Sequence, residues 1–406
     1  MLKVPGSYII PYGQPRLYST HPIPYTLYPI SYMNYYLIAG ERSGDLHGAN
    51  LIRAIRQYDP DAKCRAYGGE QMEAAGATLV RHYREMAFMG FLEVAKNLGT
   101  IRRIMRECQA DLLAHRPDAL ILIDYAGFNL RMARFAKKHG IRVFYYISPK
   151  VWAWNQRRAL KIKATVDRLF TILPFETEFF AKYDYQVDYV GNPLLDALAD
   201  FRPDPAFRSK LGLGEQAVIA LLPGSRRQEI ISILPGMLRI TRQFPHYRFV
   251  VGTVSNLPDA LYDSLLADYP DVLRISDAAY DLLHISTAAL VTSGTATLET
   301  ALLNIPQVVC YKTTGVSYFI AKRLIAVPFI SLVNLIAGQE VVKELIQSDL
   351  TTDNITTELE AILPGSPRRN VQLAGYAEVQ QKMGESGASE RAGRLMVDDL
   401  LSIKNK

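Results

Sequence analysis

The residue of this chain best suited to proton transfer is Asp124, which directly follows the apolar run Ala119–Ile123. A short apolar run of this kind predicts a buried strand. A carboxylate at the end of such a strand acts either as a general base or as a cap for the helix that follows. Desolvation at this position would raise its pKa toward the range that suits a general base. Both roles stay open for Asp124.

A second turn, after Val218–Leu222, carries groups suited to binding an anion. It contains Gly224, Ser225 and Arg226 at the start of a helical pattern. Backbone N–H groups, the helix dipole and a guanidinium could there face one diphosphate. The alternative is a capped helix with a solvated arginine.

A third turn of small residues follows Ala288–Thr292 and leads to Glu299. Its residues are Ser293, Gly294 and Thr295. Glu299 could accept hydrogen bonds from both hydroxyls of a ribose, or it could face solvent.

Two other loops are less specific. The glycine-rich loop Gly40–Gly48 precedes the helical pattern Ala49–Tyr58 and could bring bare N–H groups toward an anion or a sugar oxygen. Its spacing matches neither a dinucleotide-binding nor a Walker motif, and a tight turn with an Asp or Ser cap is the alternative. Trp152 and Trp154 follow a later strand, where an aromatic cluster suits sugar or acyl packing, although a core position is more common for tryptophan.

Alternating strand and helix patterns must position these loops. The first series of candidate strands is Tyr35–Ala39, Cys64–Tyr67, Ala119–Ile123, Val143–Ile147, Arg168–Ile172 and Val187–Val190. The second series is Val218–Leu222, Tyr247–Val251, Val272–Ile275, Ala288–Thr292 and Gln307–Cys310. Because helices separate the strands, we predict an α/β fold of two Rossmann-like, doubly wound domains. Ligands then bind in the cleft at the carboxyl ends of the strands.

The domain boundaries follow from composition. Residues 1–34 hold six prolines, six tyrosines and no acid, and we expect an unstructured arm or a true start at Met33. Residues 35–195 and 196–365 form the two domains, and the Pro- and Gly-punctuated segment Leu194–Gly214 is the expected linker. Residues 366–406 form a helical tail, with a helix over Gln372–Leu401, that packs onto either domain or onto a second subunit in a homodimer.

Composition excludes several classes of protein. The chain has 406 residues, 49% hydrophobic and 21% charged, which excludes fibres and disordered tails. Its three cysteines, Cys64, Cys108 and Cys310, are widely spaced, which argues against a disulfide framework or a thiolate metal site and favours a reducing cytoplasm. No apolar run reaches the length of a membrane span.

One segment suggests contact with a membrane surface. Four bulky apolar residues precede several arginines, and they are Met86, Phe88, Met89 and Phe91. Apolar residues flanked by cations are typical of an interfacial helix, whereas the alternative is a buried core helix. A second basic strip, from Lys150 to Arg168, would add attraction to anionic lipid.

Five motifs in order resemble the lipid-A-disaccharide synthase family. They are Ala39–Asp45, Ser148–Trp154, Leu222–Arg226, Ser293–Glu299 and Ser331–Gly338. The resemblance implies a GT-B fold and an inverting transferase that joins UDP-2,3-diacylglucosamine to 2,3-diacylglucosamine 1-phosphate (lipid X) and releases UDP. It also implies work at the cytoplasmic face of the inner membrane of Gram-negative bacteria, with no metal and no cofactor.

The resemblance also implies roles for individual residues, some inside these motifs and some between or after them. Asp124 is the candidate base, Arg226 contacts the diphosphate, and Glu41 joins them in the predicted catalytic set. The donor side is formed by the turns at Gly224 and Ser293 together with Glu299, Asn334 and Glu340. Ser43 is assigned to the acceptor side.

Some positions depart from the family pattern, and other functions stay open. Arg42 stands where alanine is common, Gly127 where relatives often carry a second acid, and Val333 where proline is common. Gly127 puts any scheme with two carboxylates in doubt. The main alternative is another UDP-sugar enzyme of this fold, such as a nucleotide-sugar 2-epimerase, which would gain nothing from the apolar segment at Met86. No recognised nucleic-acid-binding fold supports the basic strip as a nucleic-acid site.

Overall fold

The computed structural model describes residues 32–86, 98–313 and 327–405, and the elements below lie within them. The first domain is built on a parallel sheet of seven strands. In spatial order they are β3 (Thr78–His82), β2 (Lys63–Gly68), β1 (Asn34–Ala39), β4 (Ala119–Ile123), β5 (Arg142–Tyr146), β6 (Arg168–Thr171) and β7 (Asp188–Tyr189). The second domain has six strands, also parallel: β10 (Leu273–Ser276), β9 (Tyr247–Thr253), β8 (Ala217–Leu222), β11 (Ser286–Thr292), β12 (Gln307–Tyr311) and β13 (Lys343–Ile346). The predicted pair of Rossmann-like domains is confirmed.

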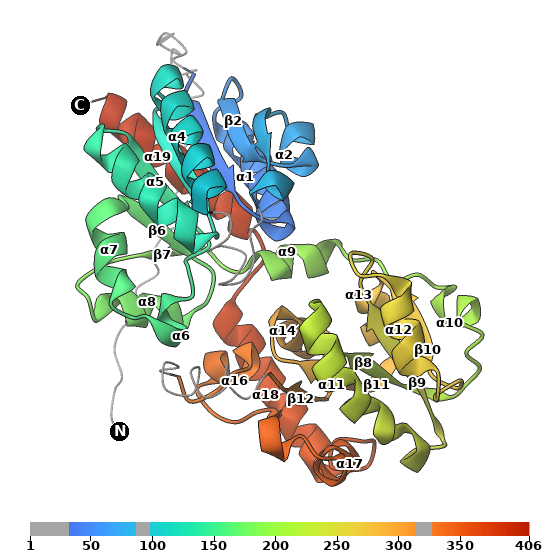
Figure 1. The fold of residues 1–406 in the computed structure, drawn as a ribbon. Helices are drawn as coiled ribbons and strands as arrows, with labels where there is room; N and C mark the ends of the chain where they lie inside the picture. Colours follow the sequence, from blue (N-terminus) through green and yellow to red (C-terminus); the bar gives the residue numbers. More distant parts are fainter. Residues whose placement is uncertain (1–31, 87–97, 314–326, 406) are drawn as a thin grey trace, which may run out of the picture.

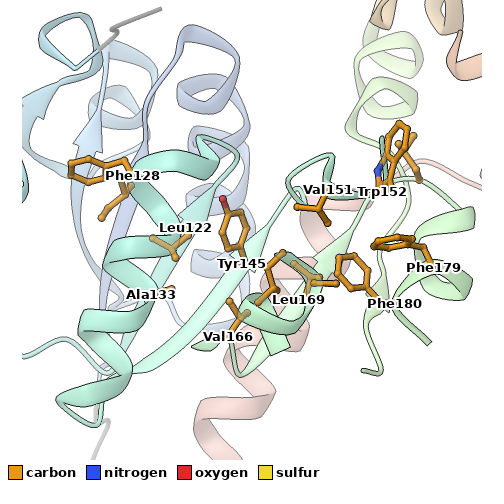
Figure 2. Packing of buried hydrophobic residues seen from close by; sticks show 14 of the residues in the cluster. Leu122, Phe128, Ala133, Tyr145, Val151, Trp152, Val166, Leu169, Phe179 and Phe180 are labelled. Atoms are coloured by element: carbon orange, nitrogen blue, oxygen red, sulfur yellow. The ribbon is translucent and has the colours of Figure 1, made fainter. Parts of the chain in front are cut away.

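Both faces of the first sheet are buried, as its apolar strands require. Leu120 and Leu122 of β4 pack on one face, and Ile121 and Ile123 pack on the other. The first face is covered by α4 (Leu98–His115), α5 (Ala126–Lys138), α7 (Arg158–Thr165) and α8 (Phe175–Ala181). Figure 2 shows the packing on this face. The opposite face is covered by α1 (Arg42–Tyr58), α2 (Glu70–Ala74) and α19 (Ala388–Lys404).

Apart from α6, which lies in the first domain, the remaining helices belong to the second domain or join the domains (Figure 1). They are α6 (Val151–Trp154), α9 (Pro193–Asp200), α10 (Phe207–Lys210), α11 (Arg227–Arg239), α12 (Asp259–Leu266), α13 (Ala279–His284), α14 (Thr295–Leu302), α16 (Leu332–Ala337), α17 (Thr352–Glu360) and α18 (Pro367–Met383), of which α6 is in the first domain. The segment predicted as a linker thus contains α9 and α10. No helix in the described ranges meets the length and apolarity of a membrane span.

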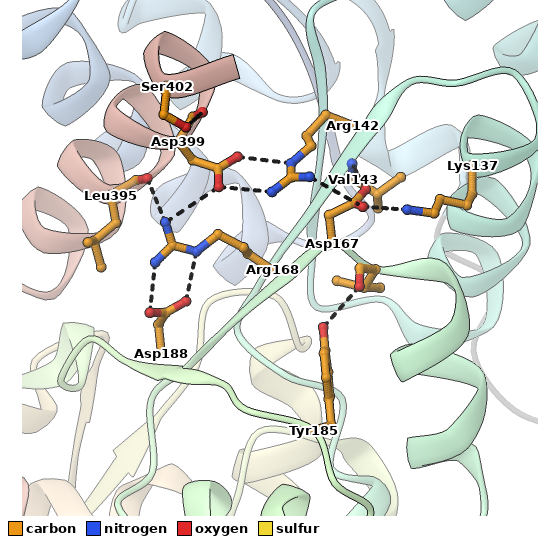
Figure 3. Close-up of polar contacts among 11 residues, drawn as sticks. Lys137, Arg142, Val143, Asp167, Arg168, Tyr185, Asp188, Leu395, Asp399 and Ser402 are labelled. Carbon is orange, nitrogen blue, oxygen red and sulfur yellow. Dashed lines mark hydrogen bonds and ion pairs between the residues drawn. The ribbon is translucent and has the colours of Figure 1, made fainter. Parts of the chain in front are cut away.

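The C-terminal tail consists of two helices that pack on different domains. Helix α18 lies against α14 and α16 of the second domain, and α19 lies against α1 of the first. Ion pairs anchor α19 to the first domain, because Asp399 accepts two hydrogen bonds of 2.9 Å from Arg142 (Figure 3). The tail therefore packs back on both domains of its own chain.

Three boundaries differ from the sequence prediction. Met33 and Asn34 were assigned to the arm, but Met33 is 1% exposed and Asn34 opens β1, where its N–H donates to Asp118 Oδ2 at 2.8 Å. Helix α1 begins at Arg42, inside the predicted loop Gly40–Gly48. The edge strands β3 and β13 were not predicted.

Close contact between α1 and α19 yields a test of this packing. A Cβ added at Gly393 would lie 2.9 Å from Ala54 Cβ and 3.0 Å from the Ala54 carbonyl carbon. Because that backbone atom cannot rotate away, we expect Gly393→Ala to lower the free energy of unfolding by about 1–3 kcal/mol in chemical denaturation. The control is Gly99→Ala in α4, where no atom lies within 4 Å of the added Cβ. An unchanged Gly393 variant would contradict the close packing.

Candidate active site

Asp124 leaves the end of β4 in a strained backbone conformation. Asp124 and Tyr125 have φ angles of 45° and 49°, in the left-handed region that non-glycine residues rarely adopt. Asn129 Nδ2 stabilises this turn by donating to the carbonyl oxygens of Asp124 at 2.8 Å and Ile123 at 3.2 Å. Tyr145 OH also donates to the Asp124 carbonyl. These contacts fix the backbone of Asp124 and leave its carboxylate exposed at the sheet edge.

The neighbouring strand β5 ends in the same way and brings a cation toward Asp124. Ile147 has a φ of 66°, which is unusual for a β-branched residue, and the chain then reaches the exposed Lys150. Desolvation by the surrounding protein raises the pKa of Asp124, although water reaches its carboxylate, and the positive charge of Lys150 opposes this rise. Strain at two adjacent strand ends is typical of functional sites.

Glu41 places a second carboxylate at this edge. It precedes α1, and its side chain makes no cap to that helix. Desolvation and the charge of Asp124 raise its pKa, while Arg226 and Lys150 lower it. Arg226 belongs to the second domain, so this interaction links charged groups of both domains. The preceding Gly40 is required because an added Cβ would lie 2.2 Å from the Tyr125 ring.

On the second domain, the turn after β8 is already paired with an acid. Gly224 has a φ of 112°, and Glu229 Oε2 accepts from the N–H groups of Ser225 at 3.1 Å and Arg226 at 3.2 Å. Both N–H groups of this turn are therefore paired within the chain. Arg226 lies 3.4 Å from Glu229 Oε1, and its side chain is 70% exposed, which leaves the guanidinium accessible to an anion.

The turn after β11 fixes the other donor-side candidates. Ser293 Oγ donates to the Ile330 carbonyl at 2.8 Å, Gly294 has open space around it, and Thr295 is exposed at the start of α14. Glu299 does not face solvent freely: it is partly buried, and Oε1 accepts from Tyr280 OH at 3.1 Å. Desolvation raises the pKa of Glu299, and the bond from Tyr280 lowers it.

Asn334 has a structural position, which corrects its expected contact with the donor. Its side chain is fully buried, and Oδ1 accepts from the N–H groups of Val341 at 2.8 Å and Val342 at 2.9 Å. Its Nδ2 donates to Glu344 Oε1 at 2.9 Å. With every polar atom bonded inside the protein, Asn334 shapes the turn before β13. Glu340 is exposed in that turn, 3.4 Å from Lys343.

The residues predicted for the acceptor side differ in their exposure to solvent. Ser43 is exposed in the first turn of α1, next to Glu41. Met86 is 1% exposed and belongs to the core, so its predicted place on a membrane-facing surface is wrong. Phe88, Met89 and Phe91 lie outside the described residues.

Sequence reasoning assigned no site role to Glu176 and treated Lys150 only as a lipid contact. Glu176 is buried and accepts from Trp152 Nε1 at 3.1 Å and from Leu173 N–H at 3.0 Å. Burial raises the pKa of Glu176 to about 7. It fixes Trp152, a core residue, in the loop that carries Lys150, whereas Trp154 is 47% exposed. For Lys150 the available signal was a charged residue in the loop after β5, and for Glu176 it was an acid in the first turn of α8.

This arrangement defines a class of protein. Two parallel sheets linked by α9 and α18–α19, with acids at the edge of one and an exposed arginine in a turn of the other, are typical of GT-B nucleotide-sugar enzymes. A UDP-GlcNAc 2-epimerase from Neisseria meningitidis bound to UDP-GlcNAc is similar, with a TM-score of 0.63, 16% identity, and coverage of 91% of this chain and 100% of that one. The glycotransferase of kitacinnamycin matches with a TM-score of 0.61, 12% identity, and coverage of 91% and 99%. At these identities the likeness shows the fold alone.

The sequence comparisons identify the family. The Lipid-A-disaccharide synthetase family model matches residues 35–395. Lipid-A-disaccharide synthases from Geobacter sulfurreducens and Syntrophus aciditrophicus are 38% and 41% identical, covering 90% and 88% of this chain and 96% and 95% of theirs. The chain belongs to the lipid-A-disaccharide synthase family and is a glycosyltransferase.

The charge of Lys150 yields a prediction for the pH profile. Because Lys150 lowers the pKa of Asp124, Lys150→Met raises it and leaves less of the ionised base at acid pH. We expect the acid limb of kcat/KM for glycosyl transfer to move to higher pH, while rates at alkaline pH change less. The control is Lys138→Met, an exposed lysine at the C-terminal end of α5. An unshifted acid limb would show that Lys150 does not act on the base.

Proposed function

We propose that the chain transfers a diacylglucosamine unit from UDP-2,3-diacylglucosamine to 2,3-diacylglucosamine 1-phosphate, with inversion, to give the disaccharide 1-phosphate and UDP. Family membership supports the reaction. The observation that carries the assignment to this site is the electrostatic interaction of Glu41 with both Asp124 and Arg226. This interaction supports the inference that the acids of the first domain and the arginine of the second serve one site.

Asp124 is the general base in this proposal. Its carboxylate takes the proton from the acceptor hydroxyl as that oxygen bonds to the anomeric carbon of the donor. The bond from this carbon to the diphosphate oxygen breaks, and UDP leaves with the electron pair. A raised pKa gives Asp124 greater proton affinity, and Lys150 keeps its ionised form accessible. Glu41 adds negative potential beside the positive charge that develops on the sugar.

Arg226 stabilises the departing diphosphate. Its exposed guanidinium can turn from Glu229 toward the phosphate oxygens. The N–H groups of Ser225 and Arg226 now bind the Glu229 carboxylate, so a diphosphate that reaches them must compete with this acid. Donor binding in this proposal therefore includes movement of Glu229. Glu299, one turn into α14, accepts from the ribose hydroxyls.

A transfer assay with Asp124→Asn tests the function. We expect turnover to fall roughly 10²-fold or more, the scale of a lost general base, because the amide cannot accept the proton. UDP affinity by calorimetry and the melting temperature should stay close to wild type. UDP release from the two acylated substrates is the measurement.

The matched control for this test is Asp61→Asn, an exposed acid between α1 and β2, which should keep its turnover. Near-normal turnover of Asp124→Asn at all pH values would remove Asp124 from the mechanism. Wild-type protein that releases no UDP from these substrates, or that epimerises UDP-GlcNAc instead, would contradict the proposed reaction.

Substrates that carry acyl chains favour a position at the cytoplasmic surface of the inner membrane. The described surface that suits an anionic bilayer is formed by α6 and α7, and we call it the α7 surface. It combines two exposed apolar side chains, Trp154 at 47% and Leu160 at 54%, with the exposed cations Arg157, Lys161 and Lys163. Apolar side chains beside cations bind anionic interfaces. Arg168 of the predicted basic strip is not part of this surface, because its guanidinium forms an ion pair with Asp188 at 2.7 Å.

Vesicle binding tests the α7 surface. Complete burial of a side chain of this size contributes roughly 1.5–3 kcal/mol, so Trp154→Ser with Leu160→Ser should weaken binding to phosphatidylglycerol vesicles by about tenfold or more. Stability should change little, because both side chains are exposed in the folded protein. Val371→Ser in α18, at a position 72% exposed, is the control and should bind as wild type does. Unaltered partitioning of the double variant would exclude the α7 surface as the membrane contact.

A further inference from the structure

The partner of Glu299 is placed by contacts that reach beyond the donor turn. Tyr280 lies in α13, and its hydroxyl donates to Glu299 Oε1 at 3.1 Å. The Tyr280 ring meets the ring of Phe201 edge-on, with centroids 5.4 Å apart and planes at 81°. Phe201 is the residue at which α9 ends. The position of the hydroxyl is thus fixed by an aromatic contact that does not involve Glu299.

A second contact holds α13 in place beside the same segment. Asp204 N–H donates to Asp281 Oδ1 at 2.8 Å, and Asp281 is the residue after Tyr280. The Phe201 ring also lies 6.4 Å from the ring of His284. Phe201 and Asp204, which follow α9, thus both contact α13. These contacts fix the position from which the Tyr280 hydroxyl donates.

This bond has a chemical consequence for Glu299. Desolvation favours the protonated form of Glu299, whereas the bond from Tyr280 favours the ionised form. Among the described residues, Tyr280 is the titratable group that acts on this carboxylate, and the pKa of its own hydroxyl is raised, so it stays a donor. With Oε1 bound to Tyr280, the orientation of Oε2 is also fixed.

We propose that Tyr280 is a positioning residue for UDP binding, one that holds the Glu299 carboxylate in an orientation toward the ribose hydroxyls. This inference rests on the proposed function, in which Glu299 is the ribose contact. A ribose hydroxyl donates well to a carboxylate and poorly to a protonated acid. Loss of the tyrosine hydroxyl therefore affects UDP affinity most at acid pH.

Calorimetric titration of UDP into Tyr280→Phe tests the proposal, because the phenyl ring keeps its contact with Phe201. We expect UDP affinity to fall roughly 3- to 10-fold near neutral pH, the scale of one ordinary hydrogen bond, because the lost bond acts on UDP only through Glu299. Without the hydroxyl the pKa of Glu299 rises further, so the pH at which UDP affinity is half lost on acidification should move upward. A merely structural role would not move this midpoint.

Two further variants make the test specific. In a Glu299→Ala background, Tyr280→Phe should have no additional effect on UDP affinity, because the tyrosine acts through Glu299. Tyr247→Phe, the same change at a partly buried tyrosine at the start of β9, should bind UDP as wild type does. Melting temperatures of all variants check that each is folded.

The outcomes separate this inference from the proposed function. If wild type binds UDP and Glu299→Ala weakens it, but Tyr280→Phe changes neither affinity nor midpoint, the role of Tyr280 is refuted and the proposed function stands. An equal loss on Tyr280→Phe with and without Glu299 also refutes it. If wild type binds no UDP, the proposed function fails, and this inference fails with it.

Discussion

The first-domain site depends on the hydrogen bonds by which Asn129 holds the backbone where β4 ends. Two consecutive non-glycine residues, Asp124 and Tyr125, adopt left-handed conformations there, at a cost of roughly 1–2 kcal/mol each. The strain persists because the fully buried β4 and the Asn129 amide fix the chain on both sides of it. Relaxed backbone at this point would turn the Asp124 carboxylate away from the sheet edge.

Charge balance extends this constraint to the second domain. The charge of Asp124 raises the pKa of Glu41, burial raises the pKa of Asp124 itself, and Lys150 lowers the pKa of both acids within the first domain. Arg226 acts on Glu41 from the second domain. The acids are therefore best stabilised when both domains contribute, which relates the geometry of the site to the relative position of the two sheets.

Much of the fold could be predicted from the sequence, and the errors have physical causes. The central strands are continuous apolar runs, and the bounds predicted for β4 agree with the structure. The edge strands β3 and β13 were missed because they are only partly buried and contain polar residues. The glycines at the start of α1 suggested a loop, but Gly48 lies inside the helix, which begins at Arg42. This glycine allows close contact with α2, since an added Cβ there would lie 2.7 Å from Met72 Sδ.

The site was predictable where a residue sits at a strand end, and less so where partners lie far apart in the sequence. Asp124 and Lys150 are separated by a whole helix and a strand, and only the pairing of β4 with β5 brings their loops together. The partners of Asn334 lie within ten residues of it in the sequence. No sequence pattern predicts, however, that both the oxygen and the nitrogen of its side-chain amide are bonded inside this turn. Glu229 lies within the helical pattern after Arg226, and nothing in that pattern indicates that its carboxylate accepts from the Ser225 N–H group predicted to face a phosphate.

The two connections between the domains are bound to each other by hydrogen bonds. Arg391 of α19 donates to Val190 O at 2.8 Å, beside the first connection, and to Glu385 O at 2.9 Å in the second. Gly191 has a φ of 85°, in the left-handed region that favours glycine. Asp196 of α9 accepts from the N–H groups of Gly387 and Ala388. Both crossings are therefore held at one place, between the domain that carries Glu41 and the domain that carries Arg226.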